Sequence, residues 1–129
     1  MLRWLKRGKN RPNKADTIWV PDVTFITEQD GDAERELKSR LTEHFKSYLR
    51  LNEAYLVRVR YGSSPEIKVA LCLDTGGKVD AELVQAAASE FPRIFGSHES
   101  LDIMFLKPEE RERISAVAKS FYSPSPYRV

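Results

Sequence analysis

The chain has 129 residues, a length typical of one domain, and 41% of them are hydrophobic, enough for a core without disulfides or metal ions. With 31% charged residues and a net charge of +2, the composition excludes a membrane-spanning protein, a collagen, a disulfide scaffold and a wholly disordered chain. Composition does not point to a reaction.

Positive charge is concentrated at the start of the chain. Residues 1–16 carry six basic side chains and one acidic, a net +5, whereas residues 17–129 carry 15 basic and 18 acidic, a net −3. The opening residues lack the continuous apolar stretch of a secretory signal. We expect a basic, flexible leader over residues 1–16. The alternatives are a contact of this leader, including Trp4, with anionic lipid or a nonspecific contact with nucleic acid.

The first predicted elements are a strand and a helix. Residues 17–20 and 23–26 are β-prone, and Pro21 between them predicts one interrupted strand or an edge segment. A helix is predicted from Asp32 to about Leu51. Its apolar residues recur at helical spacing: Leu37, Leu41, Phe45 and Tyr48.

A β-hairpin is the clearest signal in the chain. Two runs of alternating residues, 55–61 and 67–73, are joined by a Gly-Ser-Ser-Pro turn. One face is apolar, with Tyr55, Val57, Val59 and Tyr61 on the first strand and Ile67, Val69, Leu71 and Leu73 on the second. The other face carries Arg58, Arg60 and Lys68, so the pattern predicts one buried face and one basic face.

Three further elements complete the predicted domain. Asp80 begins a helix that Pro92 kinks or ends, residues 101–106 form a strand, and Pro108 begins a last helix. The order is (β)αββαβα, an α+β two-layer sandwich with a mostly antiparallel sheet and helices on one face. If residues 19–26 pair into the sheet, the order matches a ferredoxin-like fold. The predicted divisions are a leader 1–16, one α+β domain 17–122 and an extended tail 123–129.

The chemistry-bearing residues do not form a recognisable catalytic or metal motif. Cys72 with His98 and either Asp74 or Asp102 is a conceivable nucleophilic site, but Cys72 lies within an apolar strand, where burial makes a thiol inert. His44 and His98 lack metal-ligand spacing, and His44 is expected to be partly buried and hydrogen-bonded. We therefore expect no catalytic, cofactor-binding or metal-binding residues, and no cofactor.

The basic face of the hairpin is the candidate interaction surface, made of Leu56, Arg58, Arg60 and Lys68. The simpler alternative is a solvated face whose cations discourage edge aggregation. The face lacks aromatic residues for base stacking, so a protein partner or a homodimer suits it better than nucleic acid.

Four segments carry a family resemblance: residues 54–61, 69–73, 95–97 and 101–106. Together they resemble the C-terminal domain of the bacterial enhanced-serine-sensitivity (SseB) family over roughly residues 30–122. Larger members of that family carry an additional N-terminal domain, which has no counterpart in residues 1–16. The resemblance implies no known reaction, cofactor or catalytic residue.

These observations favour a non-enzymatic protein-interaction or regulatory domain. A single cysteine and the lack of an export signal favour the cytoplasm. The alternatives are a binder of nucleic acid or anionic membrane surfaces through the basic leader, and an enzyme on small molecules with an unrecognised pocket.

Overall fold

A computed structural model describes residues 2–7, 17–20, 22–96 and 99–124, with the side chains of Arg3, Leu5 and residues 22–96 and 99–124. The strands are β1 (Leu2–Arg7), β2 (Thr17–Val20), β3 (Val23–Glu28), β4 (Glu53–Tyr61), β5 (Lys68–Asp74) and β6 (Leu101–Phe105). The helices are α1 (Asp32–Phe45), α2 (Ala81–Ile94) and α3 (Pro108–Ser115).

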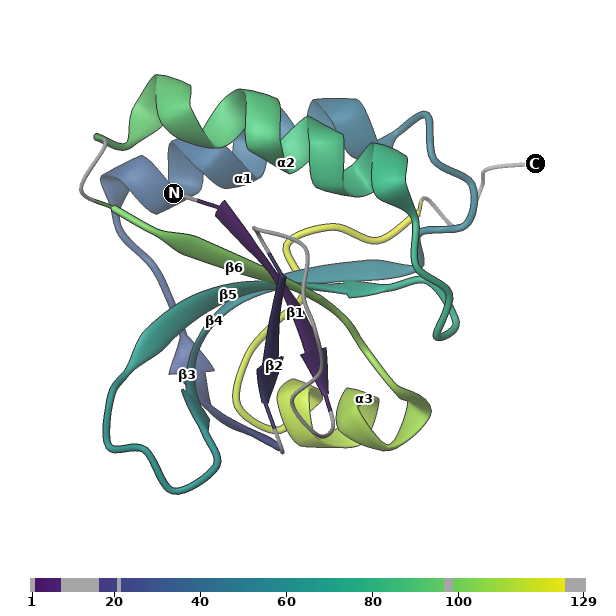
Figure 1. Ribbon diagram of the computed structural model, residues 1–129. Coiled ribbons are helices and arrows are strands. Elements are labelled where there is room, and N and C mark those ends of the chain that lie inside the picture. The colour runs from purple at the N-terminus through teal and green to yellow at the C-terminus, as the bar shows by residue number, and fades with distance from the viewer. Residues whose placement is uncertain (1, 8–16, 21, 97–98, 125–129) are drawn as a thin grey trace.

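The described strands form one mixed sheet in the order β2-β1-β6-β5-β4-β3 (Figure 1). The β3–β4 and β4–β5 pairs are antiparallel, whereas β5–β6, β6–β1 and β1–β2 are parallel. The short Gly-Ser-Ser-Pro loop allows an antiparallel hairpin, and α2 supplies the crossover that a parallel β5–β6 pair requires.

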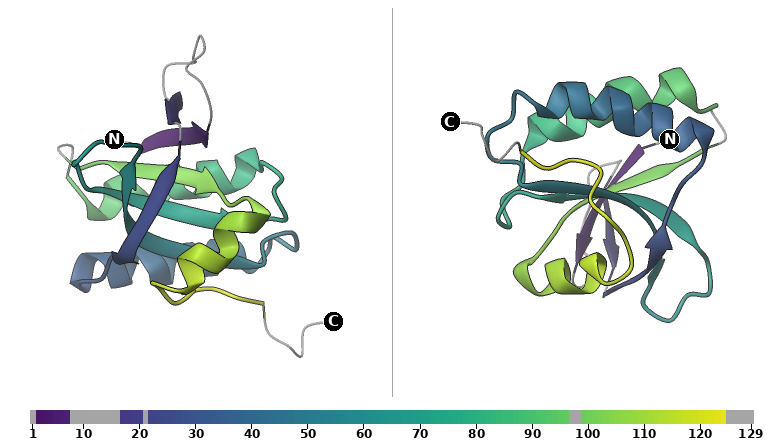
Figure 2. Two further views of the ribbon diagram at one scale, coloured as in Figure 1. Left: turned by 90° about the horizontal axis from the view of Figure 1, so that it is seen from below. Right: turned by 180° about the vertical axis from the view of Figure 1, so that it is seen from behind.

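The sheet curls toward α3, so that its two edge strands approach each other. β2 and β3 are the outermost strands, yet only residues 21 and 22 separate them in sequence. Three consecutive Cα–Cα steps reach at most about 11 Å, so the facing ends of these edge strands must be neighbours. Figures 1 and 2 show β1, β2 and β3 descending on the same side as α3.

Apolar packing fills both faces of the sheet. The α1–α2 pair covers one face, burying Leu37, Leu41 and Phe45 of α1 and Leu83, Ala87 and Phe91 of α2. The opposite, concave face buries Leu5, Val23, Phe25, Val57, Cys72 and Met104 together with Ile114 of α3. The sheet therefore separates the two long helices from α3 (Figure 2).

Local sequence explains where the helices begin. The Asp80 carboxylate accepts a hydrogen bond from the Glu82 N–H at 3.0 Å, which caps α2 as predicted. Pro108 occupies the first turn of α3, and Glu110 accepts from the Lys107 N–H at 2.9 Å. Helix α1 ends at Phe45 rather than near Leu51, and residues 46–51 form turns.

The α+β class and the order β-α-β-β-α-β-α are confirmed by the elements from β3 to α3. Three finer details differ. Parallel pairs outnumber antiparallel ones among the described strands, and α3 lies on the face opposite α1 and α2 because both faces of the sheet are apolar. The strand order also differs from a ferredoxin-like fold, because β3 and β4 are adjacent although α1 separates them in sequence.

The leader prediction requires correction for residues 2–7, which form β1 between β2 and β6. Leu5 is 1% exposed and belongs to the concave core, while Arg3 is ion-paired to Asp102. Burial and charge pairing therefore fix this segment, and it belongs to the domain. Residues 8–16 of the predicted leader lie outside the described residues, as do residues 125–129 of the predicted tail.

Candidate functional site

The structure separates the four residues that the sequence places on one interaction surface. Arg58 and Arg60 are exposed on β4. Leu56 is 2% exposed and packs beneath the α1–α2 pair, so it is not available to a partner. Lys68 lies opposite Val59 on the concave face, where it pairs with Glu66 at 2.7 Å.

The register of the hairpin explains this correction. Leu56 pairs with Leu71 and Val57 pairs with Ala70, and residues directly opposite each other share a face. Tyr55, Val57 and Val59 therefore share a face with Lys68, Ala70 and Cys72, whereas Val69 and Leu71 lie with Arg58 and Leu56. The predicted grouping is wrong by one residue, which moves every β5 side chain to the other face.

The surface that remains combines exposed cations, hydroxyls and an apolar residue. We call it the hairpin face and define it as Thr24, Thr27, Arg58, Arg60 and Val69. Thr24 pairs with Arg60 and Thr27 with Arg58, across a bulge between Phe25 and Thr27, and Arg58 pairs with Val69. The end of the hairpin extends past the α1–α2 layer, so the described helices leave the outer part of this face uncovered (Figure 1), whereas the half-buried Val69 packs against the core beneath that layer. Ile67, which is 50% exposed, immediately precedes β5 beside it.

A chain of hydrogen bonds fixes the position of Arg58. Its Nε donates to Gln29 Oε1 at 2.6 Å, and Gln29 Nε2 donates to Glu34 Oε2 at 2.8 Å. Gly31, with a φ of +154°, leaves room for Glu34, since a Cβ there would collide with the Glu34 carboxylate. The sequence contains no motif that would single out Gln29.

A small pocket opens between the helix layer and the sheet beside the hairpin face, and we call it the interlayer pocket. Its volume is about 80 Å³. Its apolar lining consists of Leu37, Leu56, Val69, Phe91, Phe95 and Leu101. Its polar lining consists of Gln29, Glu34, Glu99 and Ser100. The stacked rings of Phe91 and Phe95, with centroids 4.9 Å apart, form one wall.

A buried ionic cluster joins β1, β4 and β6. Arg3 donates to Asp102 through Nε–Oδ1 at 2.7 Å and Nη2–Oδ2 at 2.9 Å, and Asp102 is 1% exposed. Tyr61 also donates to Asp102. The hydrogen bond to Asp102 raises the pKa of Arg3, and burial followed by the Asp102 charge raises that of Tyr61. These interactions account for a charged residue within an apolar strand, and they serve the fold.

A histidine–carboxylate pair links α1 and α2. His44 Nε2 lies 2.6 Å from Glu90 Oε2, and Arg40 Nη1 lies 3.6 Å from Glu90 Oε1. The hydrogen bond from His44 lowers the pKa of Glu90, although burial opposes this effect. His44 is half-buried and hydrogen-bonded, as predicted from the sequence. The hydroxyl of Ser47 donates to the His44 backbone carbonyl at 2.9 Å, and among the described residues no nucleophilic side chain is hydrogen-bonded to the His44 imidazole.

The conceivable site built on Cys72 is not assembled within the described residues. Cys72 is 0% exposed on the concave face. Asp74 is ion-paired to Arg111 at 2.9 Å and accepts from the Gly76 N–H at 3.1 Å. Asp102 is engaged by Arg3 and Tyr61, and His98 lies outside the described residues.

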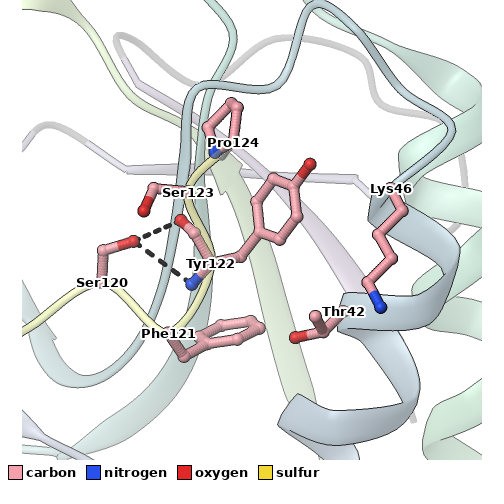
Figure 3. A pocket seen from close by; sticks show the side chains of 7 residues that line it. All are labelled: Thr42, Lys46, Ser120, Phe121, Tyr122, Ser123 and Pro124. Atoms are coloured by element: carbon pink, nitrogen blue, oxygen red, sulfur yellow. Dashed lines mark hydrogen bonds between the residues drawn. The ribbon is translucent and has the colours of Figure 1, made fainter. Parts of the chain in front are cut away.

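A larger open cavity lies between α1 and the C-terminal segment (Figure 3). It has a volume of about 590 Å³ and is lined by Thr42, Lys46, Ser120, Phe121, Tyr122, Ser123 and Pro124. Its charged lining residue, Lys46, already pairs with Glu43 at 2.9 Å. The Thr42 and Ser120 hydroxyls donate to backbone carbonyls. These three polar side chains are therefore engaged in local contacts, which provides little basis for ligand selectivity.

Within the described part of the chain, no cluster of three or more His, Cys, Asp or Glu side chains is placed to hold a metal ion. No described helix has the length and apolar character needed to cross a membrane.

Comparisons with protein-family models, with curated proteins and with solved structures found no match for this chain.

Proposed function

We propose that this protein is a non-enzymatic protein-interaction domain of the cytoplasm that binds an acidic partner segment through the hairpin face. The observation that carries the proposal is the exposure of Arg58 and Arg60 beside the half-buried Val69, at the end of the hairpin that extends past the described helices. Neither guanidinium has a carboxylate partner among the described residues. Arginine beside apolar residues is typical of protein interfaces.

The proposed function is the one that the sequence predicts, but the surface consists of other residues. Leu56 and Lys68 leave the set, while Thr24, Thr27 and Val69 join it. The resemblance to SseB C-terminal domains is compatible with such a role, and it remains a prediction.

Affinity capture with the full chain tests the proposal. Reversal of both charges, R58E with R60E, removes the attraction for an acidic segment, and we expect loss of the captured partner with no change in the unfolding midpoint. The matched control is R50E with R113E, since these residues are also exposed and the net-charge change is identical. Capture that is equal for both double variants would refute the proposal.

A photo-crosslinker at Ile67 gives a positional readout. Ile67 is half-exposed beside the hairpin face, whereas Ser115 is exposed on α3 across the sheet. We expect p-benzoylphenylalanine at 67 to crosslink the partner and the same group at 115 not to do so. Crosslinking at 115 alone would place the interface elsewhere and contradict the proposal.

The alternative function is binding of lipid or nucleic acid by the basic leader. Two leader residues are not available for it, because both make contacts within the domain. Arg3 is neutralised by Asp102, and Leu5 is buried in the concave core. Observed attraction to anionic surfaces would have to come from other basic residues of the leader.

A further inference from the structure

We propose that the interlayer pocket receives one branched aliphatic side chain of the partner, while Arg58 pairs with a carboxylate next to that side chain. This inference rests on the proposed function, because the pocket opens beside the hairpin face. It adds the chemical class that the site recognises: a short aliphatic group that carries a negative charge within a few bonds.

The size and lining of the pocket limit the group that can enter it. Its volume of about 80 Å³ is roughly half that of an engineered apolar cavity that holds benzene, so a branched aliphatic group fits better than an aromatic ring. Leu56 and Leu101 are buried within the lining, and Val69 is half-buried. An apolar group that enters this space exchanges water for hydrocarbon contacts, as the central anchors of protein interfaces do.

The hydrogen-bond chain connects the pocket to the charge that faces it. Gln29 and Glu34 both line the pocket, and Gln29 accepts from Arg58 Nε at 2.6 Å. Because Nε is engaged, the guanidinium is held in one orientation before a partner arrives. Its terminal Nη groups have no partner among the described residues and remain available as donors to a carboxylate.

Glu34 and Glu99 also line the pocket, and their negative charges disfavour an anionic ligand. Two observations reduce the effect of these charges. Glu34 accepts from Gln29 Nε2, which directs one carboxylate oxygen into the hydrogen-bond chain. Glu99 is exposed at the mouth of the pocket, where water screens its charge. On the hairpin face, Arg58 and Arg60 form a pair of cations without a described carboxylate. We therefore assign an anionic rather than a cationic class of ligand.

Three small probes with the same isobutyl group test the pocket and the charge together. They are 4-methylpentanoate, 4-methylpentan-1-ol and 4-methylpentylamine, titrated into the full-length protein and followed by methyl NMR of Leu56, Val69 and Leu101. We expect saturable shifts with the acid binding roughly threefold more tightly than the alcohol, the size of an exposed ion pair. The variant R58Q should reduce this ratio to about one, whereas R113Q should leave it unchanged.

A variant that fills the mouth separates the pocket from the charges. Ser100 lines the opening and is exposed, so S100F should abolish binding of all three probes, with S115F as the matched control on α3. The inference is overturned if the probes cause no saturable shifts at these methyls, or if the amine binds more tightly than the acid.

Partner capture distinguishes failure of this inference from failure of the proposed function. We expect S100F to lose the partner that R58E with R60E also loses. If S100F retains that partner while the charge reversal loses it, the interaction surface stands and the anchor pocket is refuted. If neither variant loses it, the proposed function fails as well.

Discussion

Arg3 and Asp102, which are 99 positions apart in the chain, form a bidentate ion pair. Its Nε–Oδ1 and Nη2–Oδ2 distances are 2.7 and 2.9 Å. The pair lies between β1 and β6, where Asp102 is 1% exposed and the Arg3 side chain 25% exposed. It holds β1 inside the sheet, next to the edge strand β2. β1 has β2 as its other neighbour, so the pair also supports the attachment of that edge strand.

The substitution D102N should therefore destabilise the protein by about 3 kcal/mol, because it leaves the Arg3 charge partly buried without its counter-charge. The smaller change Y61F removes one hydrogen bond and should cost about 1 kcal/mol. Urea unfolding at pH 7 measures both, and E112Q, at an exposed position on α3, serves as the control. If D102N unfolds at the same urea concentration as E112Q, the ion pair does not stabilise β1.

Tyr122 attaches the C-terminal segment to the rest of the domain. Ala54 and Tyr122 form an isolated antiparallel bridge, and the Tyr122 hydroxyl donates to the Phe45 carbonyl at 3.1 Å. The Tyr122 ring meets Phe45 edge-on at 5.6 Å between centroids. Y122A should cost about 3–5 kcal/mol, whereas Y122F should cost about 1 kcal/mol. L49A, at a side chain 81% exposed, should have no measurable effect, and an equally small effect of Y122A would contradict this account.

Residue patterns predicted the elements from β3 to α3 well, because each of these patterns depends on neighbours in sequence. The spacing of Leu37, Leu41 and Phe45 identified the buried face of α1, and Pro108 identified the start of α3. The face of the hairpin could not be derived in the same way. Leu56 and Val57 are both apolar because both faces of β4 are buried at this part of the strand, so alternation alone does not fix which β5 residues share a face with them.

The role of residues 2–7 depends on contacts distant in sequence. A short stretch that mixes apolar and cationic residues resembles a solvated terminus until its partners are known. Arg3 pairs with Asp102 and Leu5 packs into the concave core. Both contacts depend on the pairing of β1 with β6, which is distant in sequence. The interlayer pocket was beyond prediction for the same reason, since its walls come from α1, α2 and three strands.

The His44–Glu90 pair predicts an acid-dependent loss of stability. Hydrogen bonding to His44 holds the pKa of Glu90 below its ordinary value of 4.5. The unfolded state therefore takes up a proton at higher pH than the folded state does. The stability from this group is complete above about pH 4.5 and is lost as pH falls through the lower folded pKa.

Urea unfolding between pH 6 and pH 3 measures this dependence. The difference in unfolding free energy between the wild type and E90Q should narrow below pH 4.5. The difference between the wild type and E112Q should change less, because Glu112 is exposed. A wild-type-to-E90Q difference that stays constant down to pH 3 would contradict the assigned pKa direction.

The Cys72 thiol should be unreactive toward thiol reagents in the native state. Its side chain is 0% exposed within the core on the concave face, and burial in apolar surroundings disfavours the reactive thiolate. A thiol reagent such as DTNB should react only as fast as the protein opens, and at the free-thiol rate in concentrated urea. Rapid reaction of the folded protein would show that the concave face is open to solvent.

Gly31 is predicted to act on Arg58 through Glu34 and Gln29. A Cβ at position 31 would collide with the Glu34 carboxylate, and its φ of +154° is strained for any other residue. G31A should therefore displace Glu34 from Gln29 and loosen the Arg58 Nε–H bond, seen by NMR as faster exchange of that proton with water. E34A should have the same effect on Arg58 without the backbone strain.

G96A is the matched control, because nothing lies within 4 Å of a Cβ there and its φ is not positive. An Arg58 Nε–H signal that is unchanged in both G31A and E34A would show that the chain does not hold the guanidinium in place.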